Sequence, residues 1–314
     1  MRKQTVFLIM FLIFSLFMCL LCFPRTAASA ALDGLLLWYH SVFPVLFPFL
    51  FLSSLLIRIL NPDELPKVLT APFMRLFGCS AYGVFVIFAG FLCGFPVGAR
   101  LSSELYQQKK ITREEMCALQ GFANNLSPGF ILSYLSAEQM KCSGKGGWFL
   151  FQILGAALLV GIADAGWKNH RKVSVPQAES LKNDTKSEPL SFAVIDDCIY
   201  GAMNSALHLC AYIMLFAVLT GILTHVFPIA NPAVLLLTAG IEVTNGIHMI
   251  AESALPYAAK YIAVSALAAF GGWSALAQSA GIAGMDSELL LHYIKSRVKI
   301  TLLAILLSAA ALFL

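Results

Sequence analysis

The sequence predicts an all-α polytopic membrane protein, built from two pseudo-symmetric repeats that contain broken or re-entrant helices. Of the 314 residues, 59% are hydrophobic and only 12% are charged, and the mean hydropathy is +0.80. A soluble domain of this length has no means of covering so much apolar surface. Because an apolar run of roughly 20 residues spans a bilayer, we expect about 7–9 membrane segments.

Charge and cysteine usage exclude several other classes of protein. The net charge is +4, and the charged residues lie in short stretches between apolar runs, so no nucleic-acid partner is expected. The eight cysteines are scattered through apolar runs, where a thiol behaves as a small hydrophobe. Cys19 and Cys22 form a CxxC pair without metal-ligand neighbours. No cofactor and no metal site is therefore expected.

The first apolar run predicts an N-terminal membrane anchor over residues 1–31. Residues 5–23 are uncharged and follow Arg2 and Lys3, which places the N-terminus in the cytoplasm. The small residues at 28–30 resemble a signal-peptidase site, so a cleaved signal peptide is the alternative. The apolar run is longer than the usual core of a signal peptide, which favours the anchor.

The first repeat is expected over residues 32–166. It opens with a membrane segment at residues 32–60, in which Pro44 and Pro48 predict a kink or a re-entrant path. It closes with another apolar segment at residues 147–166.

A polar, mainly basic linker at residues 167–192 divides the chain, and a second repeat follows over residues 193–314. The second half repeats the order of the first in weaker form. Asp33, His40 and Ser41 have counterparts, at one constant offset, in Asp197, Asn204 and Ser205.

Interrupted apolar segments recur at corresponding places in the two halves. They read GFLCGFPVG (90–98), FANNLSPGF (122–130), GIEVTNG (240–246) and FGGWSALAQ (270–278). Each combines helix breakers with polar groups inside an otherwise lipid-soluble stretch. Broken, polar segments in matching positions of two repeats are typical of a solute site at the repeat interface.

The placement of basic residues favours an inverted rather than a parallel repeat. The first repeat begins outside if the N-terminus is inside, whereas the basic linker that opens the second repeat belongs inside. Treating residues 81–98 as re-entrant satisfies this and puts the basic stretch 100–113 in the cytoplasm. The same count places residues 295–299, with Arg297 among them, in the cytoplasm. The lysines within 141–145 do not fit.

Small residues and prolines are expected to shape the breaks. Gly90, Gly94 and Gly98 recur at every fourth position, which gives a stripe where another backbone can approach closely. Tight helix packing without any ligand would explain these glycines equally well. The residues assigned to the breaks are Gly90, Gly94, Pro96, Gly98, Pro128, Gly246, Gly271 and Gly272.

Polar side chains within the breaks are the candidates for solute binding. The full set is Asn124, Asn125, Ser127, Glu242, Asn245 and Gln278. Two adjacent amides at membrane depth need partners, because an unsatisfied polar group there costs several kcal/mol. They either contact the solute or bond the freed backbone of their own break. Gln278 is expected to face Asn124 across the pseudo-symmetry axis.

Glu242 is the acidic candidate. It lies in the apolar stretch LLLTAGIEVTNG, where burying a charge is expensive, so a functional role is the default interpretation. It would serve proton or cation coupling, or accept a hydrogen bond from a polar solute. The alternative is a neutral Glu242 that only bonds across helices. Asn245 lies on nearly the same helical face.

Catalytic signatures are missing from the sequence. It contains no GxxxxGK[ST] loop, no HExxH, no GxSxG elbow and no paired Cys/His metal spacing. No nucleophile with a matching base stands out, so an enzyme is not expected.

The motifs also carry a family resemblance. GFPVGARLSSELY with FANNLSPGFI, followed by IEVTNGI with FGGWSALAQ, resembles the Gate, or nucleoside-recognition, family, and within it the YlbJ-type sporulation integral membrane proteins of endospore-forming Firmicutes. The likeness runs over residues 33–298. It implies a multi-pass protein of the cell membrane needed for spore formation, with a transport activity inferred from distant similarity to concentrative nucleoside transporters. It implies no particular substrate, and this chain looks shorter than typical members.

Two classes of function therefore stay open. The first is a permease-like transporter of a small polar solute, nucleoside-like or another metabolite. The second is a non-transporting membrane scaffold of the sporulation machinery. The expected partners are the lipid bilayer and, for the transporter, a small polar solute and a coupling ion. The sequence leaves the oligomeric state open.

Overall fold

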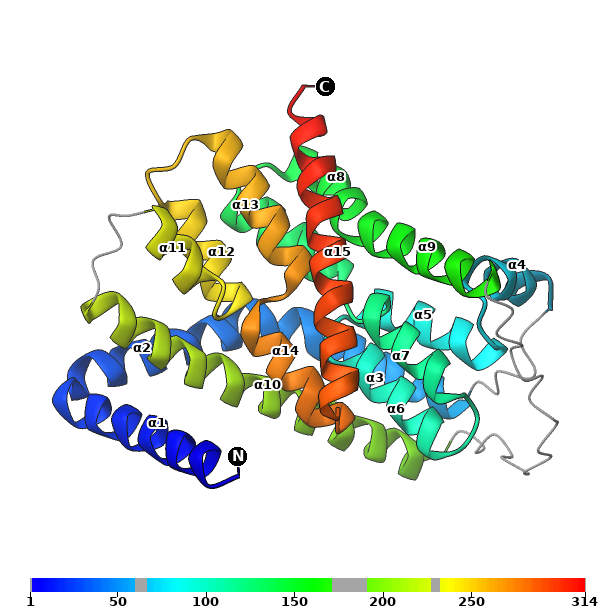
Figure 1. Cartoon of the computed structure of the whole chain (residues 1–314), viewed down its shortest axis with the longest axis horizontal. Helices are drawn as coiled ribbons and strands as arrows, with labels where there is room; N and C mark the ends of the chain where they lie inside the picture. The colour runs from blue at the N-terminus through cyan, green and yellow to red at the C-terminus, as the bar shows by residue number, and fades with distance from the viewer. Residues whose placement is uncertain (1, 60–66, 171–190, 227–231, 314) are drawn as a thin grey trace.

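The computed structural model describes residues 2–59, 67–170, 191–226 and 232–313, and every regular element in these ranges is helical (Figure 1). The first half contains α1 (Arg2–Cys22), α2 (Pro24–Leu37), η1 (Trp38–Val42), α3 (Phe43–Ile59), α4 (Lys67–Phe77), α5 (Ala81–Cys93), α6 (Val97–Gln107), α7 (Arg113–Phe122), η3 (Phe130–Gln139), η4 (Ser143–Lys145), α8 (Gly146–Leu150), η5 (Phe151–Gly155) and α9 (Ala156–His170). The second half contains α10 (Phe192–Val226), α11 (Pro232–Ala239), α12 (Val243–Glu252), α13 (Tyr257–Phe270), α14 (Gly272–Ala283) and α15 (Ser287–Ala311).

The segment expected to kink at its prolines is helical without a break from α2 through α3. Pro44 and Pro48 both lie inside this continuous stretch. The π-helical turn η1 ends two residues before Pro44. A proline ring needs room on the preceding turn and leaves a carbonyl without its usual donor, and a widened turn next to it accommodates both. The re-entrant path predicted as one alternative is therefore not found in residues 24–59, while a kink at the prolines stays a prediction.

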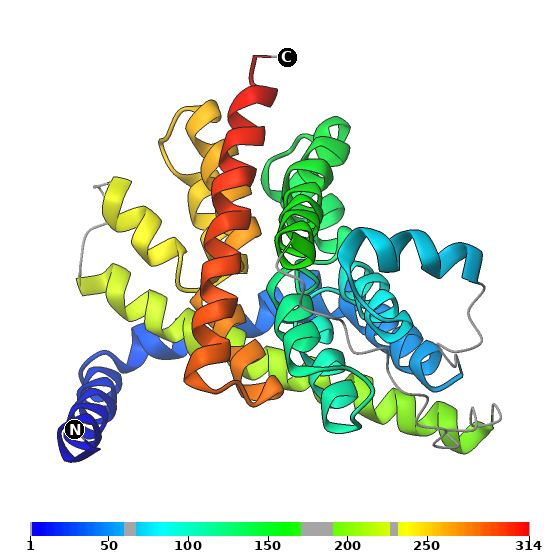
Figure 2. The same cartoon turned by 45° about the vertical axis from the view of Figure 1, so that its right-hand side comes forward.

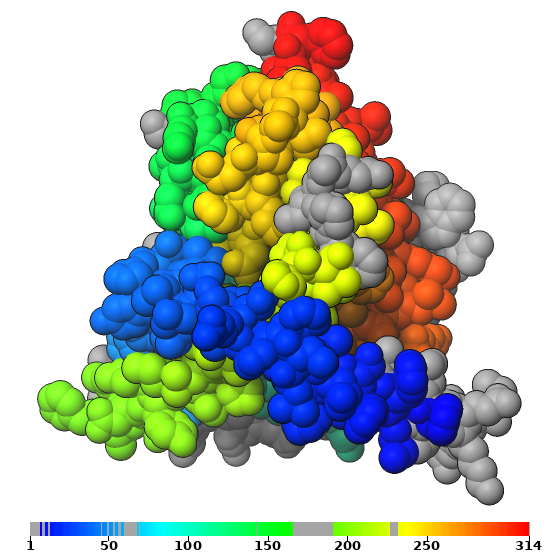
Figure 3. Space-filling model, turned by 90° about the vertical axis from the view of Figure 1, so that its left-hand side faces the viewer, coloured from blue at the N-terminus to red at the C-terminus, as the bar shows by residue number. Residues whose placement is uncertain are grey.

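This first long helical stretch packs antiparallel to α10 through small residues. A Cβ on Gly34 would lie 2.8 Å from the Cβ of Ala217, and one on Gly221 would lie 2.6 Å from the Cβ of Ala30. Each helix thus presents Ala and Gly four residues apart, which lets the two backbones approach closely. Figure 3 shows α2 and α10 side by side at the base of the molecule, with helices of both halves above them.

Two helix pairs fold back on themselves. On a continuous helix, Gly90 and Gly98 would lie about 12 Å apart. Instead a Cβ on Gly90 would lie 3.2 Å from the Cα of Gly98, so α5 and α6 form a hairpin, as a re-entrant segment requires. In the second half, a Cβ on Gly246 would touch the carbonyl oxygen of Ala239, so α11 and α12 are folded back in the same way.

The other two interrupted segments follow these hairpins. The first consists of α7 and η3, separated by residues 123–129, and the second of α13 and α14, which meet at Gly271. Together, α13 and α14 form one candidate membrane span, Tyr257–Ala283.

The last helix, α15, stands between the two halves. Figure 2 shows it upright beside α13, with α8 and α9 on its other side. One face of α15, which carries Tyr293, Arg297 and Ile300, is buried against these neighbours. Arg297 is only 1% exposed, so it is buried in the protein, unlike its exposed basic neighbours, and the predicted membrane side of this segment stays a prediction. Lys299 points away from that face, and its Nζ lies 2.7 Å from Asp164 Oδ1.

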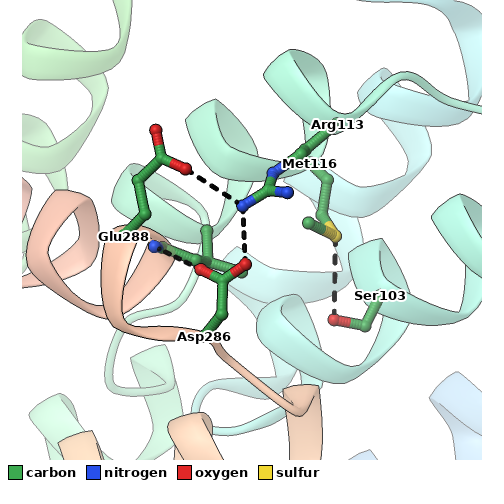
Figure 4. Close-up of polar contacts among 6 residues, drawn as sticks. Ser103, Arg113, Met116, Asp286 and Glu288 are labelled. Carbon is green, nitrogen blue, oxygen red and sulfur yellow. Dashed lines mark hydrogen bonds and ion pairs between the residues drawn. The ribbon is translucent and has the colours of Figure 1, made fainter.

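A surface ion pair joins the start of α7 to the start of α15 (Figure 4). Arg113 Nη2 lies 2.6 Å from Asp286 Oδ2 and 3.2 Å from Glu288 Oε2. Asp286 also caps α15 by accepting a hydrogen bond from the Leu289 N–H at 2.9 Å. This backbone donor, together with the Arg113 guanidinium, lowers the pKa of the Asp286 carboxyl from its ordinary value.

Three helical stretches are long and apolar enough to cross a bilayer: Gly146–Ala165, Phe192–Val226 and Tyr257–Ala283. The number rises to five if each of two bent pairs counts as one span; these are Ile13–Cys22 with Pro24–Val42, bent by 102°, and Thr70–Phe77 with Ala81–Cys93, bent by 91°. The expected 7–9 segments are not confirmed, because the breaks divide apolar runs into helices shorter than the roughly 20 residues a bilayer needs. The expected linker at 167–192 falls largely outside the described residues.

Candidate functional site

The four interrupted segments meet at one small cavity of about 60 Å³. Each segment contributes to its wall, and the lining includes Gly94, Ser127, Glu242 and Ser274, one residue from each. The helices α3 and α10 complete the wall. Segments that are up to about 180 residues apart in the chain thus share a single buried site.

Glu242 supplies the carboxylate of this cavity. It is 2% exposed, and it caps α12: its Oε1 accepts from the Thr244 N–H at 3.0 Å and its Oε2 from the Asn245 N–H at 2.7 Å. The start of a helix carries partial positive charge, which favours a carboxylate there. Among the described residues, no basic side chain forms an ion pair with Glu242. These bonds stay within its own helix rather than crossing to another.

Two further polar side chains of α14 line the cavity. Ser274 is 1% exposed, and its hydroxyl has no hydrogen-bond partner within the described ranges. Gln278 is 4% exposed and lies one turn further along the same helix. Ser127 also lines the cavity, but its Oγ accepts a hydrogen bond from the Phe130 N–H at 3.2 Å. The donors and acceptors available to a solute therefore come mainly from the second half.

The freed backbone of the second-half breaks is satisfied by the backbone itself. The Trp273 N–H donates to the Gly240 carbonyl at 3.0 Å, and the Ser274 N–H donates to the Ile241 carbonyl at 2.9 Å. The first turn of α14 thus bonds to the hairpin tip between α11 and α12. No side chain is needed to close this junction.

Asn124 does not line the cavity. It is fully buried, and its Oδ1 accepts from the Ala99 N–H at 3.3 Å. Its Nδ2 donates to Ser279 Oγ at 2.8 Å and to the Tyr293 hydroxyl at 3.2 Å. The partner across the two halves is therefore Ser279, not the expected Gln278. Successive helical residues point about 100° apart, so Ser279 faces the first half while Gln278 faces the cavity.

Asn125 bonds the backbone of its own break, as one of the two sequence interpretations had it. Its Nδ2 donates to the Phe122 carbonyl at 2.7 Å. Its Oδ1 accepts from Arg297 Nη1 at 3.0 Å. It is 2% exposed and lies outside the lining of the cavity.

Arg297 joins the carbonyl ends of two interrupted helices, a role that sequence reasoning missed. Its Nη2 donates to the Gly121 carbonyl of α7 at 3.0 Å, and its Nη1 to the Ala269 carbonyl of α13 at 3.3 Å. Its guanidinium carbon lies 5.5 Å from the ring centre of Phe95 and 5.3 Å from that of Tyr293. Helix C-termini carry partial negative charge, which stabilises a buried cation.

The break-forming residues allow close backbone contacts around the cavity. Gly94 has a φ of 82°, and a Cβ there would lie 2.7 Å from the Ser127 N. Gly271 has a φ of 91° and lies against the ring of Phe95. Both positions need a left-handed backbone that side chains rarely adopt. The peptide bond before Pro96 is cis.

The remaining candidates lie nearby without forming part of the cavity wall. Gly272 approaches the Gly240 carbonyl, and Pro128 is half-buried just before η3. The Asn245 backbone holds Glu242, while its own Nδ2 is buried without a hydrogen-bond partner in the described part of the chain. Nowhere in that part do three His, Cys, Asp or Glu side chains come close enough together to hold a metal ion.

Comparison with known proteins identifies a relative. The chain is 28% identical over 291 residues to the sporulation integral membrane protein YlbJ of Bacillus subtilis (strain 168), covering 82% of this chain and 71% of that protein. No protein-family model matches the chain, and neither does any solved structure. That relative is named as an integral membrane protein. With its apolar helices and this similarity, the chain is a multi-pass integral membrane protein that resembles the sporulation integral membrane protein YlbJ.

Proposed function

We propose that this protein is a permease-like transporter of a small polar solute, which binds in the cavity between the breaks. The observation that carries the proposal is the convergence of all four interrupted segments on one buried cavity, whose carboxylate has no basic partner in the described part of the chain. Irregular backbone at membrane depth is tolerated where it is buried in protein or lines a cavity. A carboxylate there is expensive to bury, which favours a functional role.

We further propose that the two halves form an inverted repeat. The first long helical stretch and α10 lie antiparallel, and each is followed by a re-entrant hairpin and an interrupted helix. Arg297 contacts Gly121 and Ala269, which are equivalent positions if Phe122 corresponds to Phe270. This arrangement is known from transporters in which two inverted halves alternate around a central site.

The topology is testable because the two hairpins should return to opposite faces of the membrane. We would place single cysteines at Lys109, after α6, and at Glu252, at the end of α12, in a chain without other cysteines; both side chains are exposed. An impermeant maleimide added to whole cells should label only the Glu252→Cys variant. Labelling of both, or of Lys109→Cys alone, would contradict the inverted arrangement.

The groups in the cavity indicate how a solute would bind. Glu242 accepts hydrogen bonds and attracts positive charge, whereas Ser274 and Gln278 can donate and accept. The solute therefore presents hydroxyl or amino groups to Glu242. Protonation of Glu242 or binding of a small cation would change the charge of the site, which provides a coupling step.

Uptake into proteoliposomes tests the proposal. Purified protein is reconstituted and screened for saturable uptake of nucleosides and other small polar metabolites, and the active compound is retested with Glu242→Gln. Loss of a charged acceptor should raise the KM about tenfold or more. Glu252→Gln, the same change at the exposed end of the same helix, should have no effect. Equal kinetics in both variants would remove Glu242 from the site.

A non-transporting scaffold is the second candidate. Asn124 and Asn125 favour it, because their amides bond to the protein itself. If no compound in the screen is bound or moved, and both Glu242→Gln and Ser274→Ala still support normal spore yield, the scaffold replaces the transporter.

A further inference from the structure

A second, larger cavity of about 590 Å³ lies against the small one. Its walls come from α3, α6, α10 and α14, together with Pro96 from the first hairpin tip. At about 30 Å³ for each water molecule, it has room for roughly 20 of them. The small cavity between the breaks has about one tenth of this volume, so it holds a solute more closely than the large one does.

The two cavities follow one another along the same helices. On α3 the lining passes from Leu46 in the small cavity to Leu50 in the large one, and on α14 from Gln278 to Ile282. On α10, which runs in the opposite direction, it passes from Leu209 to Ser205. The steps on α3 and α14 are four residues, about one helical turn or 6 Å, while on α10 the two linings adjoin at Leu209 and His208.

Charged side chains show which kind of medium fills the large cavity. Arg58 and Asp197 form a pair at 3.1 Å, and their side chains are 40% and 66% exposed. Arg100 and Glu104 form a pair at 2.8 Å, with exposures of 48% and 43%. Charged groups exposed to this extent are not tolerated against lipid, so they face water.

We propose that the large cavity is the aqueous vestibule through which the solute reaches the small cavity. The proposal rests on the permease function and adds a route and a solute class. Arg58 and Arg100 are balanced by Glu104 and Asp197, so the vestibule carries no net charge from its ion pairs. It therefore admits uncharged or zwitterionic polar solutes and leaves selection to Glu242.

Cysteine labelling tests whether the large cavity is open to water. In a chain without other cysteines, the rate of reaction with a charged methanethiosulfonate is measured for Asn204→Cys, which lines the cavity. Leu207→Cys is the control, because this residue is 51% exposed on the same helix but lies outside both linings. Asn204→Cys should react about tenfold faster, since thiolates form poorly against lipid. Equal reaction rates of Asn204→Cys and Leu207→Cys would overturn the proposal that the large cavity is open to water.

A plug tests whether the large cavity leads to the small one. A Cβ on Gly201 would meet no atom within 4 Å, so Gly201→Phe extends into the vestibule without a clash at its base. It should slow the labelling of Ser274→Cys in the small cavity about tenfold. Gly147→Phe also enters open space, but away from both cavities, and should leave the rate unchanged. Unchanged labelling with the Gly201 plug would overturn the route.

The solute class is tested with two reagents of similar size and opposite charge. Asn204→Cys should react with both at similar rates, because the vestibule has no net charge. A strong preference for either sign would overturn the inferred class. These labelling rates do not depend on transport. Labelling as expected without any uptake would support the aqueous vestibule but contradict the permease function. Unchanged solute uptake by the Gly201→Phe variant would be consistent with the permease function but would contradict the proposed route through the large cavity.

Discussion

The breaks of the first half and those of the second half are closed by different chemical groups. In the first half, side-chain amides complete the junction: Asn124 bonds the Ala99 N–H and Asn125 bonds the Phe122 carbonyl. In the second half, backbone bonds from Trp273 and Ser274 do the same work. Ser274 and Gln278 of the second half therefore remain available to the cavity, and Glu242 both lines it and caps α12, whereas the amides of Asn124 and Asn125 are used on the fold. Substitutions in the two halves should separate stability from solute binding.

The largest expected effect follows from removing the cation shared by both halves. Arg297→Met would leave the Gly121 and Ala269 carbonyls and the Asn125 Oδ1 buried without this donor. Each buried acceptor left without its hydrogen bond costs about 1–3 kcal/mol. Thermal unfolding in detergent should show a large drop in Tm.

Lys299→Met serves as the control for this change. Lys299 lies two residues away, and its pair with Asp164 is exposed, so little stability should be lost. Similar Tm values for the two variants would contradict the role of Arg297 in joining the helix ends.

The second-largest effect is expected from adding a methyl group at the glycines of the two hairpins. Gly98 packs on the Ala123 carbonyl, and Gly246 packs on the Ala239 carbonyl, both closer than a methyl group allows. Gly98→Ala and Gly246→Ala should each lower stability by about 1–3 kcal/mol, in either half alike. Gly144→Ala is the control, since a Cβ there meets nothing within 4 Å. If Gly98→Ala did not change the stability in the same unfolding assay, the close contact of Gly98 with the Ala123 carbonyl would be contradicted.

The contrast between the halves is tested most directly by Asn124→Ala and Ser274→Ala. Asn124→Ala leaves the buried Ala99 N–H without a partner and should cost about 1–3 kcal/mol. Ser274→Ala removes a hydroxyl that has no partner in the described structure, so Tm should not fall. Solute affinity, measured by titration, should instead decrease about fivefold for Ser274→Ala, the equivalent of roughly 1 kcal/mol. If Ser274→Ala instead lowered Tm without changing solute affinity, Ser274 would have a role in folding and not in solute binding.

The smallest effect concerns pH. The folded-state pKa of Asp286 is lowered by the Leu289 N–H and by Arg113, so its contribution is present above the ordinary aspartate pKa of about 4 and is lost as the pH falls through the lower folded value. Asp286→Asn should slightly lower Tm at pH 7. It should also reduce the loss of Tm on acidification, and an unchanged acid response would contradict the cap.

The sequence located the breaks well because helix breakers within apolar runs have few other uses. It could not show how Asn124 divides its bonds between Ala99 and the second half, since these depend on how segments pack. The count of 7–9 membrane segments is not confirmed, because short helices on both sides of a break look like spans in composition but are too short to be counted as spans in the described structure.

The basic neighbours of Arg297 in the sequence suggested an exposed cluster, but the helical spacing of the residues around it indicates that it lies on a buried face. Tyr293, Arg297 and Ile300 recur at helical intervals, and all three are buried, while Lys295 and Lys299 point elsewhere. A cluster of basic residues on a helix is therefore better assigned residue by residue, by face, than as one cytoplasmic block.

The position of Arg297 also has a consequence for biosynthesis. The helix ends at Gly121 and Ala269 emerge from the ribosome before α15. Their carbonyls therefore lack the Arg297 donor until α15 has been synthesised. Completion of the core is thereby tied to the arrival of the last helix. A nascent chain that still lacks α15 is therefore incompletely packed, and incompletely packed chains are the ones that chaperones and proteases act on.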